Sequence, residues 1–95
     1  MNKLSKERYL ELKYFCRQYS KKKTIQNNNT AAGRRAKCDV NLIEEIVKRK
    51  AKGFEQQMLR NITMGTPWEA LNAPCGRRKF YETRKKIFIG IAEFR

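Results

Sequence analysis

The apolar positions of this chain recur mainly at helical spacing. The clearest stripe lies near the C-terminus, at offsets of 0, 7, 11 and 14 residues, and consists of Phe80, Ile87, Ile91 and Phe94. One face of an α-helix with a 3.6-residue period has this spacing. We therefore predict a helix over residues 76–94 whose apolar stripe faces the core.

A short helix is predicted just before it, over residues 66–73. Thr66 offers an N-cap hydroxyl, and Pro67 suits the first helical position because that position needs no N–H. Pro74 must end this helix, since it forces the preceding residue out of the α region. A helix-turn-helix needs a small residue at the helix crossing, a turn residue four positions later and an apolar anchor six positions after that. The chain has Ala70, Pro74 and Phe80 at these positions.

Three further helices complete the predicted fold. Ser5 begins an amphipathic helix that extends to residue 19, Asp39 begins another that ends before Gly53, and a third covers residues 54–64. We predict an all-α protein, a small helical bundle of about five helices with a C-terminal helix-turn-helix. Its parts are an N-terminal helix (1–19), a flexible basic loop (20–38) and a helical core (39–95) within one domain.

The predicted loop, residues 20–38, lacks the apolar side chains that a packed element needs. Ile25 is its one large aliphatic residue among lysines, asparagines and small residues. Its cations form two clusters, which are Lys21, Lys22 and Lys23 and, beyond a polar hinge, Arg34 and Arg35. Ordering on a nucleic acid and acting as a solvated linker are equally compatible with this composition.

The net charge of the chain limits the kinds of partner that we expect. Twenty-three Lys and Arg against nine Asp and Glu, with no histidine, give a formal net charge of +14. Such an excess repels itself unless a polyanion neutralises it, so nucleic acid is the leading expected partner and an anionic membrane surface is the rival. No segment reaches the ~20 apolar residues of a membrane span, and no signal peptide is recognisable. We therefore expect a soluble, cytoplasmic protein.

The same composition leaves little for catalysis or metal binding. Cys16, Cys38 and Cys75 are widely spaced and have no histidine beside them, so neither a disulfide framework nor a zinc-finger pattern is present. Paired carboxylates and a serine with a base are also missing. We expect no enzymatic activity, no cofactor and no metal.

The predicted C-terminal helix is rich in cations. Its first turns and outer side hold Arg77, Arg78, Lys79, Arg84, Lys85 and Lys86 against one acid. In the helix-turn-helix register, the exposed front that reaches base edges in a major groove consists of Gly76, Arg77, Arg78, Tyr81 and Glu82. The predicted nucleic-acid site joins this front to Lys79, Lys85, Lys86 and the two loop clusters. The alternative is an ordinary basic helical hairpin.

The C-terminal part of the chain, especially PCGRRKFYETRKKIF, resembles the helix-turn-helix of small phage transcriptional regulators of the late-gene activator type, related to the promoter-reading domain of sigma factors. The opening KERYLELKYFCRQYSKKK is similar to the start of short prophage proteins of Gram-positive bacteria. The resemblance implies sequence-specific binding of double-stranded DNA through Gly76, Arg77, Arg78 and Tyr81, in a bacterial cytoplasm, with RNA polymerase as a further partner. Pro74 departs from the family, which usually has glycine at the turn.

Two other functions fit the sequence. An RNA-binding accessory protein would use the basic clusters, although the sequence shows no obvious aromatic stacking platform. A phage-encoded inhibitor of a host defence nuclease, of the anti-CRISPR type, would bind that defence complex and needs no recognisable motif. The apolar run of residues 87–94 is wider than one core-facing stripe. It either packs on the first helix or pairs with a second copy, with a β-strand as the structural alternative, and we favour a homodimer.

Overall fold

The computed structural model describes residues 4–94, and every regular element in that range is helical. The elements are α1 (Lys6–Arg17), α2 (Tyr19–Ile25), α3 (Ala31–Lys50), α4 (Glu55–Met64), a 3-10 turn η1 (Trp68–Ala70) and α5 (Arg77–Phe94). This confirms the predicted all-α fold and the small bundle of five helices. The C-terminal apolar run continues α5 and forms no strand in the described range.

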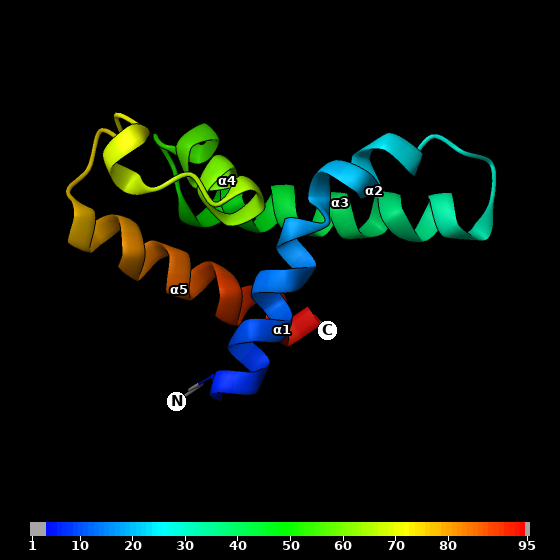
Figure 1. Cartoon of the computed structure of the whole chain (residues 1–95), viewed down its shortest axis with the longest axis horizontal. Helices are drawn as coiled ribbons and strands as arrows, with labels where there is room; N and C mark the ends of the chain where they lie inside the picture. The colour runs from blue at the N-terminus through cyan, green and yellow to red at the C-terminus, as the bar shows by residue number, and fades with distance from the viewer. Residues whose placement is uncertain (1–3, 95) are drawn as a thin grey trace.

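α3 lies along the long axis of the molecule, and the other helices pack around it (Figure 1). α2 runs back along the first half of α3, whereas α4 and α5 flank the second half. α1 crosses the middle of the molecule and packs on both α4 and α5. The chain therefore has a bundle of four helices at one end and a two-helix hairpin, α2–α3, at the other.

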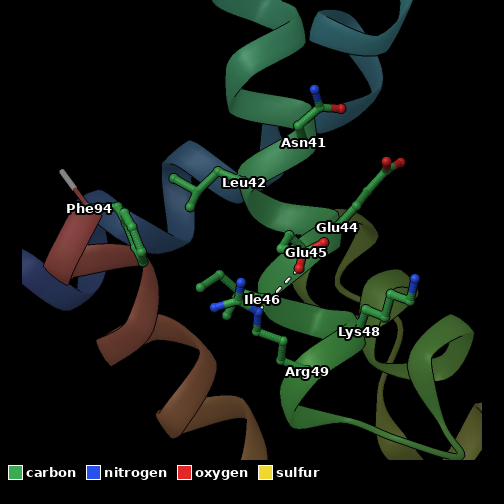
Figure 2. Close-up of a pocket in the computed structure, with 8 residues that line it drawn as sticks. All are labelled: Asn41, Leu42, Glu44, Glu45, Ile46, Lys48, Arg49 and Phe94. Atoms are coloured by element: carbon green, nitrogen blue, oxygen red, sulfur yellow. Dashed lines mark hydrogen bonds and ion pairs between the residues drawn. The ribbon is translucent and has the colours of Figure 1, made fainter.

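One hydrophobic core joins α1, α3, α4 and α5. Its largest fully buried side chains include Phe80, Phe88, Leu12, Ile43, Met58 and Ile62. Three members of the predicted stripe on α5, Phe80, Ile87 and Ile91, are completely buried, which confirms that face of the helix. The prediction for the fourth member of the stripe, Phe94, was wrong, because this side chain is 67% exposed. The last turn of α5 passes the edge of the core and lies over the outer surface of α3, beside Leu42 (Figure 2).

Helices occupy most of residues 20–38, where the sequence predicted a flexible loop. α2 extends to Ile25, and α3 begins at Ala31 rather than at Asp39. Thr30 is the true N-cap, since its hydroxyl oxygen accepts a hydrogen bond from the Gly33 amide at 3.0 Å. The prediction failed because it required large apolar side chains. Small residues allow α2 and α3 to pack by close approach of their backbones instead.

Gly33 packs tightly against the backbone of the end of α2 and of the turn that follows it. A Cβ atom added there would lie 2.2 Å from the carbonyl oxygen of Asn28 and 2.9 Å from that of Ile25. These are backbone atoms and cannot rotate away, so Gly33→Ala is expected to destabilise the fold by about 1–3 kcal/mol. Thermal denaturation followed by circular dichroism should show a Tm lower by at least about 4 °C.

Gly76 provides the matched control for this substitution. A Cβ atom added there would meet nothing within 4 Å. Gly76→Ala should therefore leave the Tm within a degree or two of the wild type. Equal melting temperatures for Gly33→Ala and the wild type would contradict the tight packing of α3 on the end of α2 and the turn between them.

The segment predicted as the first helix of the helix-turn-helix, residues 66–73, is only the single 3-10 turn η1. Its start is extended at Pro67, and Asn72 has a positive φ of 51°, so neither end can extend into an α-helix. Ala70 is exposed and forms no close helix crossing, which corrects the predicted register. Tertiary contacts hold the connection instead: Leu71 is buried and the Trp68 Nε1–H donates to the Cys75 carbonyl at 3.2 Å.

Candidate nucleic-acid interface

The front of α5 carries two arginines in surface ion pairs. Arg77 Nε lies 3.4 Å from Glu69, and Arg78 Nε lies 3.2 Å from Glu82. The side chains of Arg77 and Arg78 remain 68% and 93% exposed. Exposed pairs of this kind contribute only about 0.2–1 kcal/mol, so an arriving phosphate or base can replace the carboxylate at little cost.

Three lysines of α5 add positive charge to this surface. Lys79, Lys85 and Lys86 are exposed and belong to none of the ion pairs found among residues 4–94. Gly76 is also exposed and accepts the first backbone bond of the helix, from the Phe80 amide at 3.0 Å. The outer side of α5 therefore presents five exposed cations, counting both arginines.

Tyr81 lies at the border between this outer side and the core. Its ring is half-buried and meets the Phe80 ring edge to face, with the centroids 5.5 Å apart. The guanidinium carbon of Arg77 lies 5.5 Å from the centroid of the Tyr81 ring. Tyr81 therefore helps to orient Arg77 and is less exposed than the predicted register required.

Two of the three lysines in the predicted 21–23 cluster are used inside the fold. Lys22 pairs with Asp39 at 2.9 Å, lies over the Phe15 ring and keeps only 16% of its side chain exposed. Lys23 pairs with Glu44 at 2.8 Å, and the hydroxyl of Tyr19 donates to the same carboxylate. Hydrogen bonds from Lys23 and Tyr19 lower the pKa of Glu44. These two lysines tie α2 to α3, and only Lys21 is left exposed without an ion pair in the described range.

Arg34 and Arg35 are exposed near the start of α3. The structure does not bring them together with the cations of α5. The turn before α3 and the first turn of α5 lie at opposite ends of the long axis, which extends 41 Å (Figure 1). The predicted site therefore separates into a larger basic surface on α5 and a smaller one at the tip of the α2–α3 hairpin.

The sequence missed a cluster of rings beside α5. Tyr9 of α1 meets Phe88 of α5 edge to face at 5.4 Å, and Arg84 lies against both. The guanidinium carbon of Arg84 is 4.9 Å from the Phe88 centroid, 5.7 Å from that of Tyr9 and 5.9 Å from that of Tyr81. Only the packing of α1 on α5 assembles these residues. The apolar face that carries Tyr9 in α1 was the sole signal in the sequence.

A hollow of about 620 Å³ lies between α3 and the end of α5. Figure 2 shows Phe94 at its edge, facing Leu42 and Ile46. The surrounding side chains carry both signs of charge, including the pair of Glu45 with Arg49 at 3.1 Å. α1 covers the side of the apolar run (residues 87–94) that carries Phe88, and this hollow lies on a side of the run that α1 does not cover.

No protein-family model, curated protein or solved structure matches this chain. No described helix is long and apolar enough to cross a membrane. Residues 4–94 also contain no group of three or more His, Cys, Asp or Glu side chains arranged to hold a metal ion.

Proposed function

We propose that this chain is a sequence-specific double-stranded-DNA-binding protein that acts as a phage-type transcriptional regulator and reads the major groove with α5. The outer side of α5, with its five exposed cations, is the observation that carries the proposal. A major groove about 12 Å wide accepts one α-helix, and phosphates on both sides of it attract such a charge. The net charge of +14 supports the same class of partner.

The position of α5 favours entry into a groove. Its first turn lies at one end of the molecule, beside η1 (Figure 1), and residues 76–78 are exposed there, so they can approach base edges. Phe80, completely buried beneath this turn, fixes the helix on the core. Lys85 and Lys86 lie two turns further along, where backbone phosphates are the expected contacts. In this proposal the chain works in the bacterial cytoplasm and RNA polymerase is its further partner.

Arg78 and Lys86 separate base reading from phosphate binding. Arg78→Ala is expected to cost about 1–3 kcal/mol on a preferred site and little on random duplex, because arginine forks onto guanine O6 and N7. Lys86→Ala should weaken all duplexes about equally. The measurement is selection of bound duplexes from a random pool, followed by titration of the selected and a scrambled duplex with each variant.

Lys37→Ala is the control, since Lys37 is an exposed lysine in the first half of α3, which lies at the opposite end of the molecule from the start of α5 (Figure 1). Its affinities should equal those of the wild type. Equal, sequence-blind losses from Arg78→Ala and Lys86→Ala would reduce α5 to a generic basic helix. If neither substitution lowers the affinity for DNA, the proposal of duplex binding is wrong, and the alternative function as an inhibitor of a host defence complex is favoured.

We also propose that two copies associate through the hollow between α3 and α5. Phe94 is a large exposed ring beside Leu42, and the mixed charges around it let a two-fold-related copy place acid opposite base. A dimer of this kind would present two α5 helices to successive half-sites.

Phe94→Ser should shift the protein from dimer to monomer. Removing the ring takes away the largest exposed apolar contribution to this surface, and burial of such a side chain contributes about 1.5–3 kcal/mol in each copy. Sedimentation equilibrium over a range of concentrations measures the change. Tyr14→Ser, at an aromatic residue of α1 that is 69% exposed, should leave association unchanged. A wild-type protein that is monomeric at every concentration would rule out the dimer.

A further inference from the structure

A groove of about 490 Å³ runs between the start of α1 and the flank of α5. Its walls are mainly aromatic and apolar: the rings of Tyr9, Tyr81 and Phe88, with Leu4 at one end. Phe88 is fully buried, while Tyr9, Tyr81 and Leu4 are half-buried and so offer part of their surface to a ligand. The groove differs from the outer side of α5 because α1 builds half of it, and Lys85 is the one residue that the two surfaces share.

Three cations line the same groove, and no carboxylate does. They are Lys6, Arg84 and Lys85. None of the three takes part in an ion pair within residues 4–94, although the structure pairs other cations with most of its acids. Three uncompensated positive charges beside an apolar wall attract an anion that also has an apolar part.

Arg84 is held in place without a carboxylate. One of its terminal nitrogens, Nη1, donates to the Tyr9 hydroxyl at 2.8 Å, and its guanidinium stacks near three rings. Its Nε is buried and has no hydrogen-bond partner. Contacts with the rings and one neutral hydroxyl therefore hold the guanidinium of Arg84, and none of the ion pairs within residues 4–94 neutralises its charge.

We propose that this groove binds a single unpaired nucleotide, with the base against Tyr9, Tyr81 and the Arg84 plane and the phosphate at Lys6 and Lys85. A nucleotide combines a flat aromatic base with an anion, which is the combination that the walls offer. Bases stack on aromatic rings and on arginine planes, and the volume suits one nucleotide. The nucleotide comes either from a free mononucleotide or from an unpaired position in a strand. This proposal does not depend on duplex binding by α5.

The test uses the full chain with two probes, a fluorescein-labelled oligothymidylate of about six nucleotides and free thymidine monophosphate. Tyr9→Leu should weaken oligonucleotide binding by about 5- to 100-fold, because it removes a stacking ring and the partner of Arg84. Lys6→Gln, at an exposed residue, should weaken it by about 3- to 10-fold through loss of one phosphate contact. Fluorescence anisotropy measures both, and circular dichroism reports whether Tyr9→Leu is folded.

Matched controls lie outside the groove. Tyr14→Leu removes an exposed ring from the same helix, and Lys52→Gln removes an exposed lysine from the turn after α3. Neither should change the affinity. Losses from Lys6→Gln and Tyr9→Leu with intact controls support the groove. Similar losses of affinity from all four variants, or from none, would contradict the groove proposal. If Tyr9→Leu does not fold, the comparison of Lys6→Gln with Lys52→Gln decides the outcome.

Competitors identify the source and the chemistry of the ligand. Displacement of the labelled strand by thymidine monophosphate indicates a free nucleotide site, whereas displacement only by unlabelled oligothymidylate indicates a position in a strand. Displacement by tripolyphosphate as efficiently as by the oligonucleotide would overturn the contact with a base. If the protein binds a duplex but neither probe, the nucleotide-groove proposal is wrong and the duplex proposal stands. If it binds the probes but no duplex, only the proposal that α5 reads DNA is wrong.

Discussion

Duplex binding is expected to weaken by about 10²- to 10³-fold when the salt concentration rises from about 50 to about 200 mM. The outer side of α5 has five exposed cations, and one of them, Lys85, lines a groove together with Arg84 and Lys6. Four to six neutralised phosphates give a log–log slope of about −3.6 to −5.4 at 0.9 per contact. Titration of one duplex at several salt concentrations measures this slope directly.

Single substitutions on α5 should change that slope in a defined way. Lys85→Ala and Lys86→Ala are each expected to reduce it by about one contact. Arg34→Ala serves as the control, because Arg34 lies at the far end of the long axis from the start of α5 (Figure 1). An affinity that stays constant over the whole salt range would contradict nucleic-acid binding altogether. An equal change of slope in all three variants would mean that the duplex also contacts the hairpin.

Phe80→Ala is expected to destabilise the fold by about 3–5 kcal/mol. Phe80 has no exposed surface, and its ring centroid lies 6.0 Å from that of Phe54 and 5.5 Å from that of Tyr81. It joins the first turn of α5 to the start of α4, and a small bundle has few other side chains that could fill the cavity. Urea unfolding followed by circular dichroism gives the free energy of unfolding.

The matched control for this substitution is Leu10→Ala. Leu10 is half exposed on α1, and its removal should change the free energy of unfolding by no more than about 0.5 kcal/mol. A loss below about 1 kcal/mol for Phe80→Ala would mean that this ring does not anchor α5. The first turn of α5 would then have no fixed position from which to present Arg78.

Those parts of the fold with large apolar side chains at a 3.6-residue period could be predicted from the sequence. α5 follows the stripe of Phe80, Ile87 and Ile91, and α4 ends where Gly65 adopts a left-handed φ of 77°. Local chemistry decides both features, because the apolar period and the glycine are readable without knowledge of the neighbouring helices. The same reasoning found the α5 cations, whose exposure follows from the buried stripe on the opposite side.

Features that depend on the contact between distant segments could not be predicted. Gly33 lies in a segment with the composition of a linker, and only its contact with α2 makes it part of a packed hairpin. Lys22 belongs to a run of three lysines in the sequence, yet Asp39 and the Phe15 ring bind it inside the fold. The sequence predicted Arg84 among the cations on the outer side of the helix, whereas the packing of α1 on α5 places it among aromatic rings.

The hydrogen bond that holds the connection before α5 also gives the protein a built-in spectroscopic probe. Trp68 is the only tryptophan of the chain, it is half-buried, and its indole donates to the carbonyl immediately before Gly76. The emission of this indole depends on the geometry of the junction at which α5 starts. A ligand that pulls on the first turn of α5 therefore changes the colour or intensity of tryptophan fluorescence, so its docking can be followed in unlabelled protein.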